Sequence, residues 1–530
     1  MSRTIQIYDS TLRDGAQGEG ISFSVEDKRK IVEALDDLGV SYIEAGNPGS
    51  NPKDMEFFGG LNGLKLKCAK LAAFGSTRRR GVSAEDDLGV RSLLAAGTPA
   101  VAIFGKSSDV QVKEIIKVSP DENLMMIRDT VSFFKKHGRE VIFDAEHFFD
   151  GAASDEAYAF RTLQAAVDGG ADWIVLCDTN GGSFPLQVFQ LTGKAVQKFG
   201  VSIGVHCHDD GGMAVANSIM AVEAGASQVQ GTLIGFGERC GNANLSSVIP
   251  ALQLKKGWRC VPEERMMELT AAARLVAEIS NVTLHSGMPY VGKSAFAHKG
   301  GMHIDAVSKT PSSYEHVEPE SVGNDRRILM SEVSGRSTIL NKVQPFFPGL
   351  KKDSREAGML ADLLKEMEHR GYQYEGAESS FELLVRKRLG RFKPFFRLER
   401  FTVIEELRLE NGHVSSSALI VIGVDGVKKM SAAEGNGPVH ALDKAFRMAL
   451  EEFYPGLRSV HLTDYKVRVL DPEEATAARV RVWIESTDGH MCWSTVGVST
   501  DIIEASCLAL VDSIEYKLLK DVETKIKAFM

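Results

Sequence analysis

The sequence predicts a (β/α)8 TIM barrel, followed by a mainly helical connector and a C-terminal α+β domain with an internal repeat. Three observations lead to this prediction. Short apolar runs alternate with longer amphipathic ones from residue 4 to about residue 250, at a spacing of roughly 25 to 35 residues. Polar residues follow these runs, as they do at the C-terminal ends of barrel strands, where active sites lie. The pattern becomes mainly helical after about residue 255 and strand-like after about residue 396.

Eight apolar runs supply the predicted barrel strands. Helical stretches follow most of them, for example Val25–Leu38 directly after Ser24, a residue type that favours a helix start. Eight parallel strands in about 250 residues fit a closed barrel. The predicted strands are Thr4–Tyr8, Val40–Ile43, Leu66–Ala73, Ala100–Phe104, Glu140–Asp144, Trp173–Leu176, Val201–His206 and Gln228–Gly231.

The turn after the first strand separates the barrel from its main competitor. A six-stranded doubly wound sheet would usually carry a glycine-rich phosphate turn at this place. Here the turn runs from Asp9 to Gly15 and is charged. The closed barrel is therefore the better prediction.

The C-terminal part predicts two further domains. The connector, residues 281–395, contains the glycine-rich loop Ala297–His303. Residues 396–530 show the same order of elements twice, which indicates a duplicated ββα-type unit that could bind a small effector at its seam. We expect a barrel domain over residues 1–280 before them. The repeated elements are strands Arg397–Leu409 and Ser416–Val424 before helix Val439–Phe453, and strands Val467–Val469, Arg479–Ile484 and Cys492–Val498 before helix Ile502–Leu519.

Composition and charge limit the functional classes. The chain has 530 residues, of which 43% are hydrophobic and 25% charged, as in soluble globular proteins. Its net charge of −9 argues against a nucleic-acid partner, which would need a clustered basic face. The seven cysteines form no C-x-x-C pair, and neither a signal peptide nor an apolar run of about 18 residues is found. We expect a cytoplasmic protein that contacts no membrane and binds a small molecule.

His206 and His208, at the end of the seventh strand, are the main candidates for a metal site. Residues i and i+2 of a strand project from the same face, so both imidazoles can reach one ion. Asp14, at the end of the first strand, could complete a three-ligand face, since the first strand of a closed barrel lies near the seventh and eighth. Simple hydrogen bonding is the alternative for a lone histidine. A histidine pair at the catalytic end of a barrel favours the metal.

Three segments resemble the signatures of the DRE-TIM metallolyase superfamily. The C-terminal half resembles its Claisen-type synthases, which join acetyl-CoA to an α-keto acid. The amino-acid sequences of three segments, Tyr8–Gly20, Glu44–Pro52 and Glu146–Gly151, are most similar to the pyruvate-using branch, the (R)-citramalate synthases. The three signature segments are Asp9–Gln17, His206–Gly212 with Ala216-Asn217, and Gly231–Asn242.

The resemblance implies a metal-dependent acyltransferase that forms citramalate and CoA from acetyl-CoA and pyruvate. Asp14, His206 and His208 match the ligands of a divalent cation, with Mg²⁺, Mn²⁺ and Zn²⁺ left open, and Asn242 matches a position that supplies an amide oxygen. Arg13 would stabilise the negative charge that develops on the keto oxygen. An ion pair of Arg13 with a nearby carboxylate is the alternative role, and the two can coexist.

Further roles follow from the same resemblance. Thr179 would hydrogen-bond the substrate carboxylate, and Phe104 and Asp144 would line the keto-acid pocket, with Phe74 beside them. Two side chains are candidates for the base that deprotonates acetyl-CoA. Glu146 follows the fifth strand, and His303, accompanied by Tyr314, lies in the connector loop. Histidine has an ordinary pKa of about 6.5 and glutamate one of about 4.3, so only glutamate would need desolvation to act at neutral pH.

The resemblance also implies partners and leaves alternatives. It suggests a homodimer in a route to isoleucine, with isoleucine as a feedback effector bound by residues 396–530. 2-Isopropylmalate and homocitrate synthases are the near alternatives, since they differ in the keto acid. A non-catalytic amino-acid sensor is the remote one, because none of the four metal-ligand residues has been lost. A lyase that cleaves hydroxymethylglutaryl-CoA is disfavoured, as Gly237–Asn242 lacks its longer cysteine-bearing loop.

Overall fold

The computed structural model describes residues 3–60, 64–329, 342–344, 346–351, 354–408, 413–471, 473, 477–489 and 491–529. The chain divides into two compact units. The first comprises residues 1–297 and 315–327, and the second comprises residues 298–314 and 328–530. Each unit has its own hydrophobic core.

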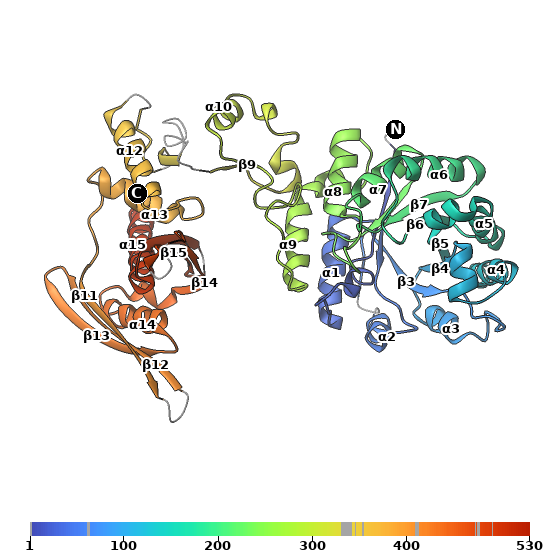
Figure 1. Ribbon diagram of the computed structural model, residues 1–530, viewed down its shortest axis with the longest axis horizontal. Coiled ribbons are helices and arrows are strands. Elements are labelled where there is room, and N and C mark those ends of the chain that lie inside the picture. Colours follow the sequence, from blue (N-terminus) through green and yellow to red (C-terminus); the bar gives the residue numbers. More distant parts are fainter. Residues whose placement is uncertain are drawn as a thin grey trace. The chain divides into compact units, whose positions relative to one another are not determined.

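The first unit is built on a closed barrel of eight parallel strands (Figure 1). The first strand pairs with both the second and the eighth, so that Tyr8 lies opposite Tyr42 on one side and Gln230 on the other. The predicted barrel is confirmed, and each predicted strand overlaps an observed one. The strands are β1 (Gln6–Asp9), β2 (Tyr42–Glu44), β3 (Lys70–Ser76), β4 (Ala100–Lys106), β5 (Glu140–Glu146), β6 (Trp173–Asp178), β7 (Ser202–Cys207) and β8 (Gln228–Gly231).

Helices surround the barrel because alternate strand residues point outward and need an apolar cover. Ile7 and Ile43 belong to the large outer core, whereas their neighbours Tyr8 and Tyr42 belong to a small inner cluster. The first helix begins with a capping box between Ser24 and Asp27. The helices are α1 (Val25–Leu38), α2 (Pro52–Gly59), α3 (Leu88–Ala95), α4 (Pro120–Lys136), α5 (Phe148–Gly169), α6 (Pro185–Lys198), α7 (Ala214–Glu223), α8 (Leu245–Pro250) and α9 (Leu269–Ile279).

The second unit contains two three-stranded antiparallel sheets, each followed by a helix. The first repeat consists of β11 (Arg397–Arg408), β12 (His413–Val424), β13 (Val427–Gly435) and α14 (Pro438–Leu450). The second consists of β14 (His461–Val469), β15 (Val480–Thr487), β16 (Cys492–Ser499) and α15 (Ile502–Phe529). The helices α10 (Gly301–Lys309), α12 (Arg355–His369) and α13 (Glu378–Arg388) precede these repeats.

The predicted C-terminal repeat is confirmed, with one strand more in its first half. β13 is largely exposed and rich in lysine and alanine, so it shows little of the apolar alternation that marks a strand in a sequence. The predicted end of the preceding strand at Leu409 lies outside the described residues.

A glycine in the last strand of each repeat has the same function. A Cβ atom on Gly435 would lie 2.4 Å from the backbone nitrogen of Ala441, and one on Gly497 would lie 2.0 Å from the carbonyl oxygen of Ala505. Each glycine therefore allows the following helix to pack directly on its sheet. No helix in the described part of the chain is both long and apolar enough to cross a membrane.

Candidate metal centre

A cavity of about 210 Å³ opens at the C-terminal ends of the barrel strands. We call it the barrel-mouth cavity. It brings together nine of the site residues that the sequence predicts, from loops and strands far apart in the chain. The residues that line it are Arg13, Asp14, Gln17, Phe74, Phe104, Asp144, Glu146, Cys177, Thr179, His206, His208 and Glu238.

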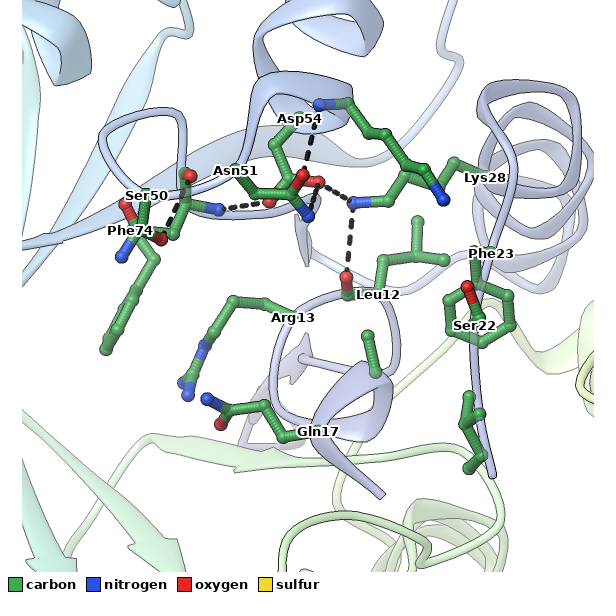
Figure 2. A pocket seen from close by; sticks show the side chains of 14 residues that line it. Leu12, Arg13, Gln17, Ser22, Phe23, Lys28, Ser50, Asn51, Asp54 and Phe74 are labelled. Atoms are coloured by element: carbon green, nitrogen blue, oxygen red, sulfur yellow. Dashed lines mark hydrogen bonds and ion pairs between the residues drawn. The ribbon is translucent and has the colours of Figure 1, made fainter. Parts of the chain in front are cut away.

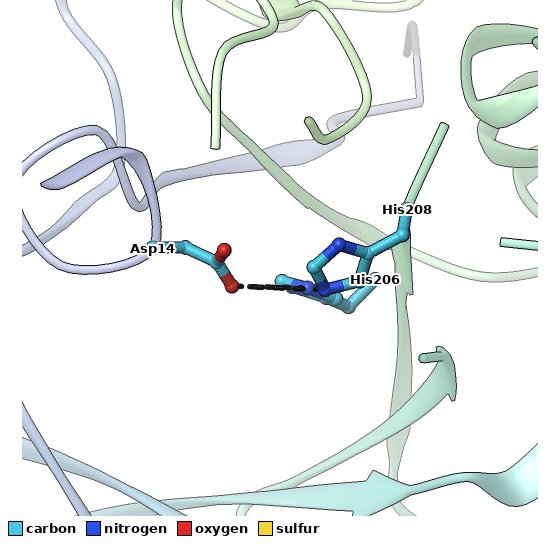
Figure 3. A group of neighbouring side chains, drawn as sticks. All are labelled: Asp14, His206 and His208. Carbon is cyan, nitrogen blue, oxygen red and sulfur yellow. Dashed lines mark ion pairs between the residues drawn. The ribbon is translucent and has the colours of Figure 1, made fainter. Parts of the chain in front are cut away.

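Asp14, His206 and His208, which line this cavity, form a compact group (Figure 3). One ligand atom from each lies within 4.8 Å of the others. Oδ2 of Asp14 is 3.5 Å from Nε2 of His206 and 3.9 Å from Nε2 of His208. The two histidines share a face as their i, i+2 spacing predicts, whereas Asp14 lies in the loop after β1 rather than on the strand.

The protonation of this group suits a metal ion. Burial would raise the pKa of Asp14, but Arg13 and the two histidines outweigh it and hold that pKa below its usual value. Burial lowers the pKa of His206 and brings the pKa of His208 to about 4. At neutral pH the group therefore offers one carboxylate and two neutral imidazoles, the forms that bind a metal.

Three buried polar atoms at this place have no hydrogen-bond partner among the described residues. They are Oδ1 of Asp14, Nδ1 of His208 and Oδ1 of Asn242. An unpaired buried polar atom costs roughly 1–3 kcal/mol. A cation would give the two oxygens a partner, so the residues present fit a divalent metal.

Asn242 reaches the group from the loop after β8. Its Nδ2 lies 3.3 Å from Nε2 of His206, and the residue is 1% exposed. A Cβ atom on Gly237 would lie 2.1 Å from Oδ1 of Asn242, so only glycine leaves room for this amide.

Gln230 supports the site, although no motif in the sequence points to it. Its Oε1 lies 3.1 Å from Nδ1 of His206, and its Nε2 donates to Oδ1 of Asp144 at 3.1 Å. This contact holds His206 with Nε2 toward Asp14. Gln230 is an inward-pointing residue of β8, and a buried amide inside a strand has no sequence motif of its own.

Arg13 is held on three sides. Its Nε donates to Oε2 of Glu44 at 2.5 Å, its Nη1 donates to Oδ2 of Asp14 at 2.8 Å, and its guanidinium carbon lies 3.8 Å from the ring centre of Phe74. Glu44 is fully buried and also accepts a hydrogen bond from the hydroxyl of Tyr8. Arg13 thus forms the structural ion pair considered from the sequence and still faces the barrel-mouth cavity.

The other predicted substrate-binding side chains, Asp144, Thr179 and Phe104, line the same cavity. Burial and the nearby charge of Glu44 raise the pKa of Asp144 to about 8. The hydroxyl oxygen of Thr179 accepts a hydrogen bond from the backbone of His147 at 2.8 Å. Phe104 stacks on Phe74 with ring centres 5.1 Å apart.

The two candidate bases lie in different units. Glu146, at the end of β5, faces the barrel-mouth cavity and forms an ion pair with Lys106 at 2.5 Å. His303 and Tyr314 belong to the second unit, where their rings stack with centres 4.1 Å apart.

Several known proteins are similar to this chain over nearly its whole length. A family profile described as HMGL-like matches residues 4–276. One described as homocitrate synthase post-HMGL domain-like matches residues 290–371, and one described as the LeuA allosteric (dimerisation) domain matches residues 375–518. An (R)-citramalate synthase of Aquifex aeolicus is 51% identical over 99% of this chain and 100% of its own length.

Two further relatives widen the comparison. An (R)-citramalate synthase of Geobacter sulfurreducens is 50% identical over 98% of both chains. A probable 2-isopropylmalate synthase of Methanopyrus kandleri is 32% identical over 96% of this chain and 98% of its own length. Both the barrel and the segments after it therefore have counterparts in these enzymes, and the chain belongs to the HMGL-like family.

Proposed function

We propose that this chain is an (R)-citramalate synthase, which condenses acetyl-CoA with pyruvate and hydrolyses the thioester to give citramalate and CoA. The observation that best supports this is the group of Asp14, His206, His208 and Asn242 at the mouth of the barrel. Two of its buried oxygens have no hydrogen-bond partner among the described residues. The choice of keto acid rests on identity, which is 51% to a citramalate synthase and 32% to a probable 2-isopropylmalate synthase.

The chain's own residues account for binding and charge stabilisation. A divalent cation at Asp14, His206, His208 and Asn242 would act as a Lewis acid on the keto group. Arg13, a permanent cation fixed by Glu44, stabilises the negative charge that the keto oxygen gains during attack.

Two side chains suit the carboxylate of the keto acid. The oxygen of Thr179 already accepts a hydrogen bond from a backbone amide, so its own hydrogen is free to donate to the substrate. The raised pKa of Asp144 keeps that group largely protonated at neutral pH, so it too can donate a hydrogen bond. Both side chains line the same cavity as Arg13.

Exchange of the acetyl-CoA methyl protons for deuterium distinguishes the two candidate bases. The variants Glu146→Gln and His303→Asn keep side chains of similar size and lose the ability to take up a proton. In a non-reacting mixture of enzyme, metal, acetyl-CoA and a pyruvate analogue that lacks the keto group, the variant of the true base loses the exchange. The other variant keeps it.

The keto-acid assignment is tested by following free thiol in the presence of a divalent metal and acetyl-CoA. We expect pyruvate to give a higher kcat/KM than 2-ketoisovalerate or 2-ketoglutarate. His206→Ala should abolish the metal-dependent reaction with every keto acid. Faster turnover with either larger keto acid would show that the chain is a different synthase of this family.

We also propose that the second unit forms a homodimer and binds isoleucine as a feedback effector. The unit matches an allosteric dimerisation domain, and a cavity of about 520 Å³ lies between α14 and β14. It offers acidic and basic side chains for an amino-acid backbone and apolar ones for a branched side chain. Its lining residues are Val439, His440, Asp443, Arg447, Glu451, Arg458, Val460, His461, Leu462 and Tyr465.

Titration of the protein with isoleucine, leucine and valine in a calorimeter tests this part of the proposal. Isoleucine should bind most tightly and should inhibit thiol release. The variant Val439→Asp should lose the inhibition and keep the uninhibited rate. Equal binding of all three amino acids would contradict the assignment of isoleucine.

A further inference from the structure

A second cavity, of about 230 Å³, lies beside the barrel mouth (Figure 2). It shares Arg13, Gln17 and Phe74 with the barrel-mouth cavity. Lys28 of α1 and Asp54 of α2 form part of its wall, and each is at most 5% exposed. Neither residue belongs to the metal group or to the predicted substrate contacts.

All three hydrogens of the Lys28 ammonium group are used in hydrogen bonds within the protein. Its Nζ donates to the carbonyl oxygen of Ala45 at 2.6 Å, to Oδ1 of Asp54 at 2.5 Å and to the carbonyl oxygen of Leu12 at 3.3 Å. An ammonium group has three donors, so none is left for solvent or substrate. One buried side chain therefore joins the loop after β1, the loop after β2 and helix α2.

Asp54 fixes the other end of this arrangement. Its Oδ2 accepts a hydrogen bond from the backbone nitrogen of Asn47 at 2.7 Å. Gly46 has φ 146° and a Cβ atom there would lie 2.3 Å from Oδ2, so the loop after β2 closes tightly on the carboxylate. The position of Lys28 is thereby determined by two segments that do not themselves carry site residues.

The contact with Leu12 gives this ion pair a functional meaning. Leu12 directly precedes Arg13 and Asp14, and it is 1% exposed. The side chain of Arg13 is held by Glu44. The backbone of Leu12 is held by Lys28, which also donates to the carbonyl oxygen of Ala45, the residue directly after Glu44. The end of β2 thus holds the metal-bearing loop at two successive points.

We propose that Lys28, oriented by Asp54, is a positioning residue that fixes the backbone of Leu12 and thereby places Asp14 for the metal and Arg13 for the substrate. This inference rests on the metal site of the proposed function. Among the described residues, Lys28 donates to Leu12, Ala45 and Asp54 and to none of the four metal-ligand residues, so it acts through the loop.

If Lys28 has this positioning role, replacing the ion pair should affect protein stability and metal affinity differently. A lone buried charge strongly destabilises a protein, whereas replacing a whole buried ion pair by apolar side chains is often neutral or stabilising. A pair that only filled space would therefore lose nothing when both partners are replaced. A pair that holds Leu12 would still lose the hydrogen bond to that carbonyl.

The test compares Lys28→Met with the double variant Lys28→Met/Asp54→Leu, using metal-free protein and Mn²⁺ titrated under electron paramagnetic resonance. We expect the single variant to unfold at a lower temperature and the double variant to regain much of that loss. Both variants should bind Mn²⁺ at least about tenfold more weakly than the wild type, the size of effect seen when support of a metal ligand is removed.

Controls separate this outcome from others. Lys517→Met removes another buried lysine, paired with Asp488 at 2.9 Å in the second unit, and should lower stability without changing Mn²⁺ affinity. If Lys28→Met does not fold, Asp54→Asn provides the weakened pair. Wild-type Mn²⁺ affinity in the double variant would overturn the positioning role. Failure of the wild type to bind Mn²⁺ would instead contradict the metal site itself.

Discussion

The side chain of Arg13 combines a carboxylate partner, a metal-site carboxylate and an aromatic face in one position. A planar guanidinium can donate in two directions while its flat face stacks on a ring, whereas a lysine ammonium has no flat face to stack. The identity of this cation, and not only its charge, is therefore expected to matter for catalysis.

We predict that Arg13→Lys lowers kcat by roughly 100-fold or more, the effect of losing one fixed donor to a developing oxyanion. Steady-state release of free thiol from acetyl-CoA measures it. Arg79→Lys, at an exposed arginine paired with Asp87, serves as the control and should keep the wild-type rate. A fully active Arg13→Lys enzyme would mean that a positive charge alone suffices.

Gly237 is the residue whose lack of a side chain makes room for Asn242. We predict that Gly237→Ala displaces the amide and weakens metal binding by about tenfold or more, as judged by calorimetric titration. Gly182, in the loop after β6, has no atom within 4 Å of its would-be Cβ. Gly182→Ala should therefore bind metal normally, and equal effects of both changes would argue against the steric explanation.

Helix α15 carries a carboxylic acid in the core of the second unit. Glu515 is 3% exposed, and its Oε2 accepts a hydrogen bond from the backbone nitrogen of Phe395 at 3.1 Å. Burial raises the pKa of Glu515 from 4.5 to about 7. Because the folded pKa exceeds the unfolded one, its contribution to stability is complete below pH 4.5 and is lost as the pH rises through about 7.

Glutamine at this position cannot ionise and can still accept the bond from Phe395. We predict that the free energy of unfolding of Glu515→Gln increases relative to that of the wild type, by about 1–3 kcal/mol, as the pH rises from 4.5 to about 7. At higher pH the difference between the two proteins should stay constant. Urea unfolding across this range measures the difference. Glu434→Gln, at an exposed glutamate, should show no such trend.

Helices and strands with a strong pattern of apolar residues could be predicted from the sequence. Features that depend on contacts between distant parts of the chain could not. The barrel strands are buried on both faces, so they appear as apolar runs. His206 and His208 are neighbours on one strand face, so their spacing alone indicates a shared ligand. β13 was not predicted because its side chains are mostly exposed and polar.

Lys28 and Asp54 show the same limit at the level of side chains. A lysine in one helix and an aspartate in another look like ordinary solvent-exposed residues. Their burial follows from a contact across 26 residues of sequence, between α1 and α2. Periodicity describes one element at a time, so it carries no information on this pairing. The roles of His303 and Tyr314 came from resemblance alone, and they stay predictions.

The molecule as a whole has separate cores in its two units, and the metal group belongs to only one of them. A ligand that binds the folded form stabilises that form by about 2.7 kcal/mol at a free concentration 100 times its Kd. The stabilisation acts on the cooperative unit that contains the site.

We therefore predict two transitions in differential scanning calorimetry of the metal-free protein. Adding Mn²⁺ should move only the transition of the barrel unit to higher temperature. His206→Ala should remove that shift and leave the other transition in place. A single transition that moves as a whole would show that the two units unfold together.

The closure of the barrel through β1 and β8 has a consequence for the order of events in the cell. The metal ligands come from the loop after β1, from β7 with the residue after it, and from the loop after β8, so they are separated by almost the full length of the barrel sequence. A ribosome must complete the last strand before the first can acquire its second neighbour. A chain that stops after β7 and before β8 carries Asp14 and the histidine pair, but it lacks Asn242 and the strand that closes the barrel. We therefore expect ion binding only once β8 and the loop after it have been synthesised.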